Sequence, residues 1–302
     1  MPIEFFQMCF VVAVVTLPRV WHGIIKPRAE SSADLSYRVS SLAYWSGAIT
    51  QRTDTVFKKF VDSNGLIEKR ELQLKAVSEF PFIRETILRE FPYVRDWTHE
   101  ERLKFEIRTL IIMRKKHFRG AEGFEISNYH KIIISATLAR LTMGIRRKFD
   151  LPRFQLIEVY PREFYSRLIE RDVKGLTLGN GRLFLSWAHF EEGHDDPSDK
   201  VHVGLHEFAH AIMIEFDKFE YTPAWADWHR EAHPVYRSIA DTENHFFRQY
   251  GGTNMAEFWA VTVETFFEQP REFSMQFPSL FRETCRMLNQ RPQEVNGEIV
   301  KW

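Results

Sequence analysis

Residues 206–210 read His206-Glu207-Phe208-Ala209-His210, and this stretch decides the fold class that the sequence predicts. Two histidines four residues apart project from the same face of a helix, so both imidazoles can reach one cation at roughly 2.1 Å. Glu207 lies too far round the helix to be a third ligand, but it is well placed to hold a water molecule bound to that cation. In such an H-E-x-x-H pattern, zinc lowers the pKa of the water and the carboxylate takes its proton.

The pattern also arises by chance, and the alternative interpretation is two core histidines beside an exposed glutamate. The context favours a metal site, because the motif follows a pair of predicted strands and has small or apolar neighbours such as Gly204 and Leu205. We expect its helix to begin at Ser198, a good N-cap after the acidic loop Glu191–Asp196, and to run to about Ile214.

A catalytic zinc needs a third protein ligand and an open coordination position. The extended motif is absent, because Met213 and Phe216 stand where it has a glycine and a third histidine. His202 lies one turn before the motif, but three histidines on successive turns are too far apart for one tetrahedral ion, so it is interpreted as a neighbour of the ligands or as incidental. The third ligand must come from further along the chain, where the candidates are Glu220, Glu231, His233, Glu243, His245, Glu257 and Glu264.

Two of these candidates, Glu257 and Glu264, lie on one predicted helix, Met255–Phe267, whose remaining face is apolar. A carboxylate can face inward on such a helix only if a positive charge neutralises it, and zinc would do so. The alternative for Glu257 is a capping box with Asn254.

The composition limits the function classes. The chain has 302 residues, 44% of them hydrophobic, which is enough for a sizeable core. Lys plus Arg and Asp plus Glu both total 41, so no net charge draws the protein to nucleic acid, and no direct nucleic-acid binding is expected. Cys9 and Cys285 are the only cysteines, which excludes a disulfide-dense scaffold and a cysteine-rich zinc site.

An apolar stretch opens the chain. Phe5–Leu17 is almost wholly apolar and shorter than the roughly 20 residues of a membrane span, and a weaker apolar run continues to Ile25. A membrane anchor and a buried N-terminal helix fit equally well, with a cleaved signal behind both, because Met1–Glu4 contains no basic residue. We therefore expect a cytoplasmic protein, or one anchored to a membrane through residues 5–25.

The remaining pattern predicts an α+β protein. We expect residues 1–30 to form the hydrophobic segment and a polar linker, and residues 31–302 to form one domain with a helix-leaning extension over 31–90. Helices are predicted after the capping box of Thr98 and Glu101, and from Ser127 to near Gly144. The predicted strands are Phe154–Val159 and a hairpin formed by Leu176–Leu178 and Leu183–Leu185.

A series of short motifs runs from about Phe91 to Pro292. It comprises Phe118-Arg119-Gly120, Glu122-Gly123, the helix after Ser127, Val159-Tyr160-Pro161, Leu185-Ser186-Trp187, Asp196-Pro197, Ala256–Val261, Glu264–Phe267 and Phe277–Leu280. Together with residues 206–210, this series resembles the Mlc titration factor A family of zinc peptidases and, more distantly, the catalytic domain of anthrax lethal factor. The resemblance implies a zincin-like metallopeptidase domain with a small mixed sheet, an H-E-x-x-H active-site helix and a helical N-terminal part.

The resemblance also implies the roles of particular residues. It assigns one zinc ion to His206, His210 and Glu257, and the general base to Glu207. A tyrosine seven residues before the glutamate ligand, here Tyr250, would hydrogen-bond the developing oxyanion.

The resemblance makes Glu264 a supporting group behind the ligands. The chain departs from the family pattern at residues 211–214, where Ala-Ile-Met-Ile replaces a basic residue followed by an acidic one, and this puts substrate selection beside the site in doubt. It also carries roughly sixty extra residues before the family's usual helical start, and these bear on location and partners.

Three functions are consistent with these residues. The first is hydrolysis of a peptide or protein substrate bound along an edge strand, for which Arg182–Trp187 is the predicted strand. The second is sequestration of a transcriptional regulator by a mainly structural metal domain, since the family is named for binding a transcriptional repressor. The third is a metal-bound structural domain with a closed four-ligand site. The intact Glu207 favours the enzyme, because binding alone does not require it.

Overall fold

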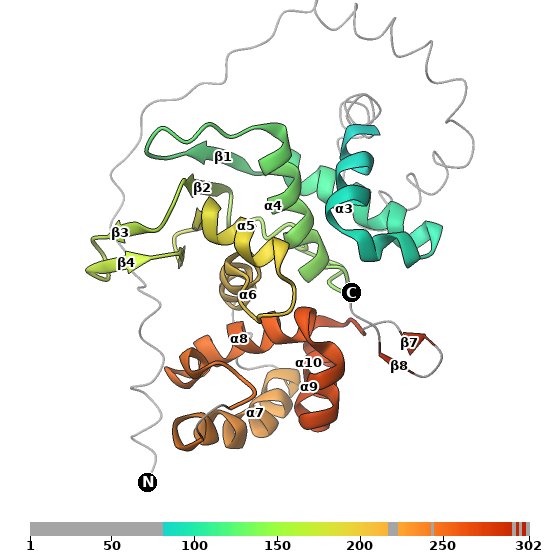
Figure 1. The fold of residues 1–302 in the computed structure, drawn as a ribbon, viewed down its shortest axis with the longest axis vertical. Coiled ribbons are helices and arrows are strands. Elements are labelled where there is room, and N and C mark those ends of the chain that lie inside the picture. Colours follow the sequence, from blue (N-terminus) through green and yellow to red (C-terminus); the bar gives the residue numbers. More distant parts are fainter. Residues whose placement is uncertain (1–80, 217–222, 243–244, 292–293, 296–297, 300–302) are drawn as a thin grey trace, which may run out of the picture.

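The structure is a computed structural model, which describes residues 81–216, 223–242, 245–291, 294–295 and 298–299. The predicted apolar segment 5–25, most of the predicted extension 31–90, and the candidate ligands Glu220 and Glu243 lie outside the described residues. Within the described residues the chain is α+β, as predicted, with helices around a small mixed sheet (Figure 1).

The helices are arranged on both sides of α6 (Val203–Glu215), the helix that contains residues 206–210. Figure 1 shows the sheet with α3, α4 and α5 on one side of α6, and α7 to α10 on the other. The bounds are residues 81–90, η2 (Pro92–Asp96), α3 (His99–Lys115), α4 (Asn128–Leu141), α5 (Trp187–Asp195), α7 (Pro223–Asp241), η4 (Gln249–Gly252), α8 (Met255–Glu268), α9 (Pro270–Gln276) and α10 (Pro278–Leu288).

The main sheet has the strand order β1-β2-β6-β5. Its strands are β1 (His117–Gly120), β2 (Leu156–Tyr160), β5 (Gly175–Leu178) and β6 (Arg182–Ser186). β1, β2 and β6 are parallel, whereas β5 pairs with β6 in the antiparallel sense as the predicted hairpin. Two small hairpins complete the strands, formed by β3 (Phe164–Ser166) with β4 (Arg171–Val173) and by β7 (Glu294–Val295) with β8 (Glu298–Ile299).

Local capping signals set the helix starts that the sequence predicts. The Thr98 hydroxyl accepts a hydrogen bond from the Glu101 backbone N–H at 3.3 Å, and the Glu101 carboxylate accepts one from the Thr98 N–H at 3.0 Å. Ser127 caps α4 in the same way, and that helix ends at Leu141, shortly before the predicted end near Gly144. Each cap satisfies N–H groups that have no partner inside the helix, so both starts are confirmed.

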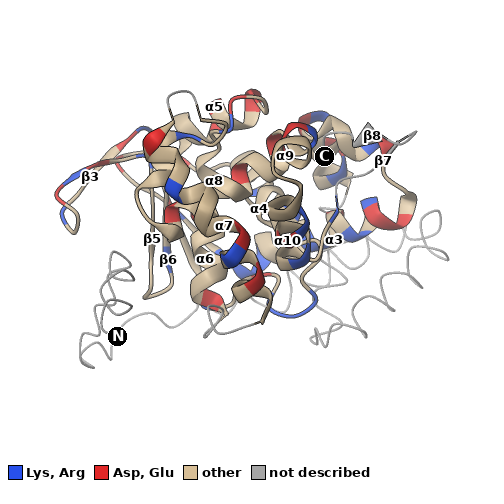
Figure 2. Cartoon of the chain, turned by 90° about the horizontal axis from the view of Figure 1, so that it is seen from below, with Lys and Arg blue, Asp and Glu red and all other residues tan. Residues whose placement is uncertain are grey.

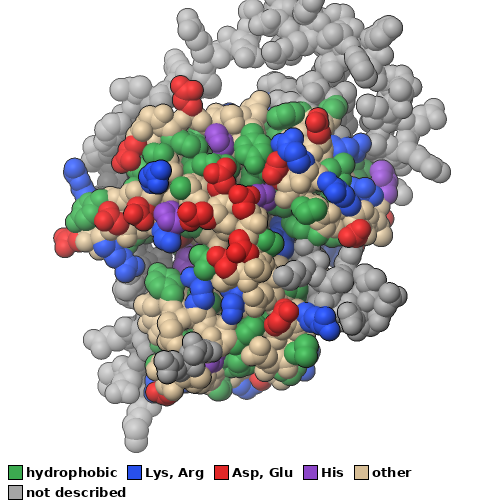
Figure 3. Space-filling model, in the orientation of Figure 1, with side chains coloured by type: hydrophobic (Ala, Val, Ile, Leu, Met, Phe, Trp, Pro, Cys, Tyr) green, Lys and Arg blue, Asp and Glu red, His purple; other side chains and the backbone are tan. Residues whose placement is uncertain are grey.

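The predicted start of the motif helix is wrong. Residues Glu191–Asp195 belong to α5 rather than to a loop, and α6 begins after His202, whose side chain accepts a hydrogen bond from the Gly204 N–H at 3.2 Å. Ser198 lies instead in a turn, where its backbone N–H donates to the Asp196 carboxylate at 3.0 Å. The acidic residues around α5 are exposed, and Figure 3 shows acidic side chains gathered there.

The predicted edge strand is also misplaced. Arg182–Ser186 forms β6, which lies between β2 and β5, and Trp187 is already the first residue of α5. The sequence shows the β5–β6 hairpin but not the parallel pairing of β6 with β2, which joins distant segments. The edge strand beside α6 is therefore β5.

The crossing of α6 and α8 is fixed by core packing. Phe208 and Ala209 of α6 and Phe258 and Trp259 of α8 are fully buried. The indole N–H of Trp259 donates to the Ala209 carbonyl at 3.1 Å, so the two helices are tied at one point of their contact. This tie holds the polar residues of both helices in a defined relation.

None of the helices in the described part of the chain is both long and apolar enough to cross a membrane. The predicted anchor at residues 5–25 lies outside that range, so its membrane association stays a prediction.

Glu268, at the end of α8, is a buried carboxyl group that affects stability. Its side chain is 1% exposed, and neither oxygen has a hydrogen-bond partner within the described residues. Burial, reinforced by the charge of Glu264, raises the pKa of Glu268 to about 9. The group therefore stays protonated at neutral pH in the folded protein.

This raised pKa predicts a pH-dependent effect of Glu268→Gln. The unfolded chain loses the proton near pH 4.5 and the folded chain near pH 9, so the stabilising contribution of the protonated group is lost as pH rises between these values. Relative to the native protein, the variant should gain unfolding free energy on the order of 1 kcal/mol per pH unit in this window. Urea unfolding of both proteins from pH 5 to 8 measures this difference in unfolding free energy. Glu272→Gln, at an exposed glutamate, is the control and should follow the native protein. A difference between Glu268→Gln and the native protein that does not change with pH would contradict the prediction.

Candidate metal centre

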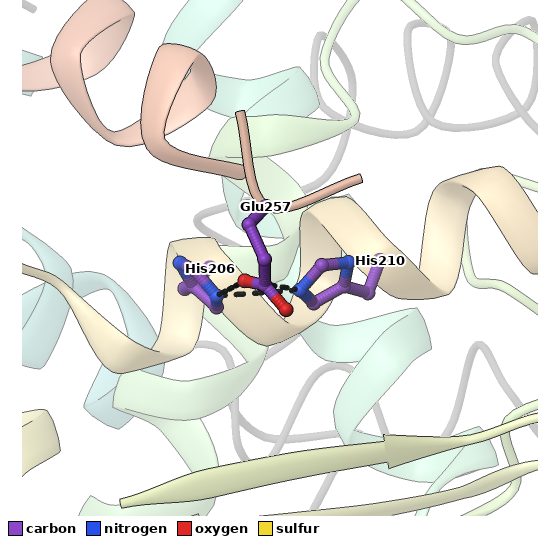
Figure 4. Close-up of side chains that lie close together, drawn as sticks. All are labelled: His206, His210 and Glu257. Atoms are coloured by element: carbon purple, nitrogen blue, oxygen red, sulfur yellow. Dashed lines mark hydrogen bonds and ion pairs between the residues drawn. The ribbon is translucent and has the colours of Figure 1, made fainter. Parts of the chain in front are cut away.

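Helices α6 and α8 bring His206, His210 and Glu257 together (Figure 4). Glu257 reaches from α8 to a position between the two imidazoles. Its Oε2 lies 3.0 Å from His206 Nε2 and 3.4 Å from His210 Nε2, and the two Nε2 atoms are 3.2 Å apart. A tetrahedral cation with ligands at about 2.1 Å spaces its donor atoms roughly 3.4 Å apart, so this group has the dimensions of a zinc site.

The start of α8 explains why Glu257 is available to the histidines. The Asn254 side chain accepts hydrogen bonds from the N–H groups of Ala256 and Glu257, at 2.9 and 3.0 Å. Asn254 therefore caps the helix by itself, and the Glu257 carboxylate is turned towards the histidines instead of closing a capping box.

Glu264, two turns further along α8, supports the other side of His206. Its Oε2 lies 3.1 Å from His206 Nδ1, and its Oε1 accepts a hydrogen bond from the His202 N–H at 2.9 Å. Arg248 pairs with the same carboxylate, which is 1% exposed and would otherwise be an uncompensated buried charge. A proton on Nδ1 shared with Glu264 leaves Nε2 of His206 free to bind a metal.

The charges around His206 match those of a cation site. Burial disfavours a charged imidazole, but the charge of Glu264 and hydrogen bonds to Glu257 and Glu264 outweigh it and raise the pKa of His206 to about 10. Burial would likewise raise the pKa of Glu257, yet hydrogen bonds to His206 and His210 lower it well below its usual range. The carboxylates thus favour positive charge at this point, and nitrogen and oxygen donors of this kind suit zinc.

Glu207 is buried against β5. The Thr177 hydroxyl lies 2.7 Å from Glu207 Oε2 and donates to it. Gly175, two residues earlier on the same strand, makes this approach possible, because a Cβ there would lie 2.6 Å from Glu207 Cγ. Burial raises the pKa of Glu207, while the charges of the nearby His206 and His210 oppose this shift. The alternative interpretation with an exposed glutamate is therefore wrong.

Tyr250 lies on η4, beside His206. Its ring centroid is 5.7 Å from that of His206, and its side chain remains 40% exposed. Burial of the hydroxyl and the charge of Glu257 raise the pKa of Tyr250 to about 12, with Arg171 opposing the shift. The phenol is therefore protonated at neutral pH and can donate a hydrogen bond.

The other described candidate ligands lie outside the group of His206, His210 and Glu257. Glu231 pairs with Arg230 on α7, and His245 contacts the Ser238 hydroxyl at 3.2 Å. His233 lies on α7 against another histidine, with ring centroids 5.7 Å apart.

Sequence reasoning missed four residues around the site, for reasons that differ. Gly175 and Thr177 share one face of a strand through their two-residue spacing, a signal that is visible only once β5 is known to pack on α6. Arg171 and Arg248 carry no local pattern. Both reach the site because of tertiary contacts alone.

The similarity to known proteins extends over the part of the chain that contains His206, His210 and Glu257. Residues 67–288 match the model of the glucose-regulated metallo-peptidase M90 family, a match that begins before Phe91, the first residue of the motif series. A protein of unassigned function from Synechocystis sp. is 25% identical over 215 residues, covering 63% of this chain and 77% of the relative. Mlc titration factor A of Escherichia fergusonii is 23% identical over 229 residues (67% and 83%), and that of Salmonella typhimurium is 22% identical over 231 residues (67% and 84%). The resemblance to the Mlc titration factor A family is confirmed, and the chain belongs to the glucose-regulated metallo-peptidase M90 family.

Proposed function

We propose that this protein is a zinc-dependent peptidase with a zincin-like catalytic domain. The observation that carries the proposal is the convergence of His206, His210 and Glu257 beside the buried carboxylate of Glu207. When bound by the first three residues, one zinc ion would lower the pKa of a water molecule towards neutrality and polarise the peptide carbonyl. Membership of a metallo-peptidase family supports the same reaction class.

Glu207 is proposed as the general base. Its hydrogen bond from Thr177 fixes the carboxylate beside the histidines, and its raised pKa brings it closer to neutrality, where a group can both accept and release a proton. Glu207 would accept the proton of the attacking water and pass it to the leaving amine.

Tyr250 is proposed to stabilise the transition state. Its phenol is protonated at neutral pH, and its partly exposed ring lies 5.7 Å from the ring of His206. A hydrogen bond from this hydroxyl to the developing oxyanion would strengthen as negative charge accumulates on the carbonyl oxygen. Glu264 has a positioning role, because it holds His206 with Nε2 directed towards Glu257.

The number of protein donors separates a catalytic role for the metal from a purely structural one. Among the described residues, the group contains three protein donors and no fourth His, Cys, Asp or Glu. A structural zinc site is normally closed by four protein ligands, whereas a catalytic site keeps one position for water. Three donors therefore favour the enzyme.

A second candidate function is binding of a transcriptional regulator. It is favoured by the relatives named Mlc titration factor A, which cover two thirds of this chain. In that case the metal centre would be mainly structural, and the buried Glu207 would have no chemical task. Variants of Glu207 therefore separate the two candidates.

The proposed function is tested by metal analysis combined with digestion of a peptide library. The purified chain should contain about one zinc ion per molecule and should cleave peptides. A chelator should remove both the metal and the cleavage, and added zinc should restore both, because three protein donors hold the ion. Cleavage that survives complete removal of the metal would contradict the proposal.

A further inference from the structure

The β3–β4 hairpin places a cationic side chain beside the proposed active site. In Figure 1 the hairpin projects from the body of the protein, and Figure 2 shows residues of both charges along it. β4 (Arg171–Val173) continues through Lys174 directly into β5, the strand that contacts Glu207. The Lys174 carbonyl accepts a hydrogen bond from the Ser186 N–H at 2.8 Å, which anchors the base of the hairpin.

The strand register shows which face of the hairpin carries Arg171. Arg171 pairs with Ser166, and residues directly opposite each other in an antiparallel pair lie on the same face. Ser166 and Phe164 on this face are buried, and Phe164 stacks on Tyr160 with ring centroids 4.0 Å apart. Tyr165, on the other face, is 60% exposed. Arg171 therefore lies on the face of the hairpin that is turned towards the body of the protein.

Arg171 nevertheless remains exposed. Its guanidinium interacts with the phenol of Tyr250, which is itself 40% exposed. An arginine on the inner face of a hairpin can stay exposed only if the space in front of it is open to solvent. That space adjoins Tyr250 and, through it, the ring of His206.

The charge of Arg171 is not neutralised by an ion pair with any described residue. Other arginines near the sheet and the site are paired: Arg119 and Arg182 share Glu158, and Arg248 pairs with Glu264. The Tyr250 group that Arg171 contacts is a hydroxyl and not a carboxylate. Arg171 is thus a cation available to an anionic group that enters the site.

We propose that Arg171 binds a carboxylate of the peptide substrate and so selects substrates that carry one close to the scissile bond. The planar guanidinium matches a carboxylate through two parallel N–H···O hydrogen bonds. The carboxylate is either the free C-terminus of the peptide or an aspartate or glutamate side chain. This inference rests on the proposed peptidase function, and it adds the substrate class.

Binding to an inactive protein tests the inference without depending on hydrolysis. In a full-length Glu207→Gln background, affinities are measured for four forms of one peptide: with its glutamate and a free C-terminus, with that glutamate replaced by glutamine, with an amidated C-terminus, and with both changes. Arg171→Gln should weaken binding of a carboxylate-bearing form about 10- to 100-fold and leave the doubly neutral form unchanged. Arg171→Lys should lie between, because it keeps the charge but loses the planar fork.

Arg167→Gln is the matched control, since Arg167 is an exposed arginine in the turn of the same hairpin. It should leave all four affinities unchanged. If Arg171→Gln no longer weakens binding of the glutamine form, Arg171 binds the glutamate side chain. If it no longer weakens binding of the amidated form, Arg171 binds the C-terminus. Equal effects of Arg171→Gln on all four peptides, or no effect on any, would overturn the inference even if the protein hydrolyses peptides. Carboxylate-selective binding without hydrolysis in the native protein would instead overturn the peptidase proposal and leave the role of Arg171 as a binding residue.

Discussion

Glu207→Gln is expected to reduce peptide hydrolysis about 10²- to 10⁴-fold while the protein keeps its bound zinc. Glutamine preserves the size of the side chain and can still hydrogen-bond the Thr177 hydroxyl, which lies 2.7 Å from the native carboxylate. It cannot accept the proton of the attacking water. The measurement is kcat on a cleaved peptide together with zinc content per chain.

A matched control for this variant is Glu231→Gln. Glu231 is a partly exposed glutamate on α7 that lies outside the group of potential metal donors. This control should retain both zinc and turnover. Retained turnover in Glu207→Gln would exclude Glu207 as the base, and loss of zinc would show that it contributes to binding the metal.

The same variant addresses the second candidate function. Sequestration of a regulator would use a protein surface and not the proton-accepting carboxylate. A DNA-binding partner captured equally well by the native protein and by Glu207→Gln, in the absence of any peptide cleavage by either, would favour sequestration.

Helices with local signals could be predicted from the sequence. The boxes that begin with Thr98 and Ser127 and the Asn254 cap each involve residues within three positions of one another, so their geometry is encoded locally. The β5–β6 hairpin is equally local. Its type and register follow from two β-prone runs around a glycine-rich turn.

Non-local features could not be predicted in this way. The position of β6 inside the sheet depends on parallel pairing with β2, and the start of α6 depends on the turns that follow α5. Ser198 has the chemistry of an N-cap, yet its N–H bonds to Asp196, so a plausible local signal was overridden by a competing turn.

The candidate site, like the fold, has a local part that the sequence predicts and a non-local part that it does not. The spacing of His206 and His210 requires only a helix, whereas the choice of Glu257 among distant candidates required the family resemblance. The contact that brings Glu257 to the histidines is made by the crossing of α6 and α8, which periodicity does not show. Sequence alone could therefore state that a carboxylate was needed, but not which one.

Glu257→Ala is expected to weaken zinc binding more than 100-fold, so that the purified variant loses most of its metal. Glu257 supplies the only carboxylate in the group of three donors among the described residues. Its removal leaves two imidazoles and takes away the negative charge nearest to the proposed ion. The start of α8 should persist, because Asn254 caps it independently of the Glu257 side chain. Zinc affinity is measured by competition with a chelator, and circular dichroism checks the fold.

Glu264→Gln is the variant with which Glu257→Ala is compared. Glu264 contacts Nδ1 of His206 and not the group of donor atoms, so its loss disturbs the orientation of one ligand and should weaken zinc binding only about 10- to 100-fold. If Glu257 is the third ligand, Glu257→Ala must exceed Glu264→Gln in its effect on the metal, although Glu264 is the more buried of the two. Unchanged zinc content in Glu257→Ala would assign the third ligand to another residue, and equal losses in both variants would indicate that burial of charge, rather than direct coordination, governs the site.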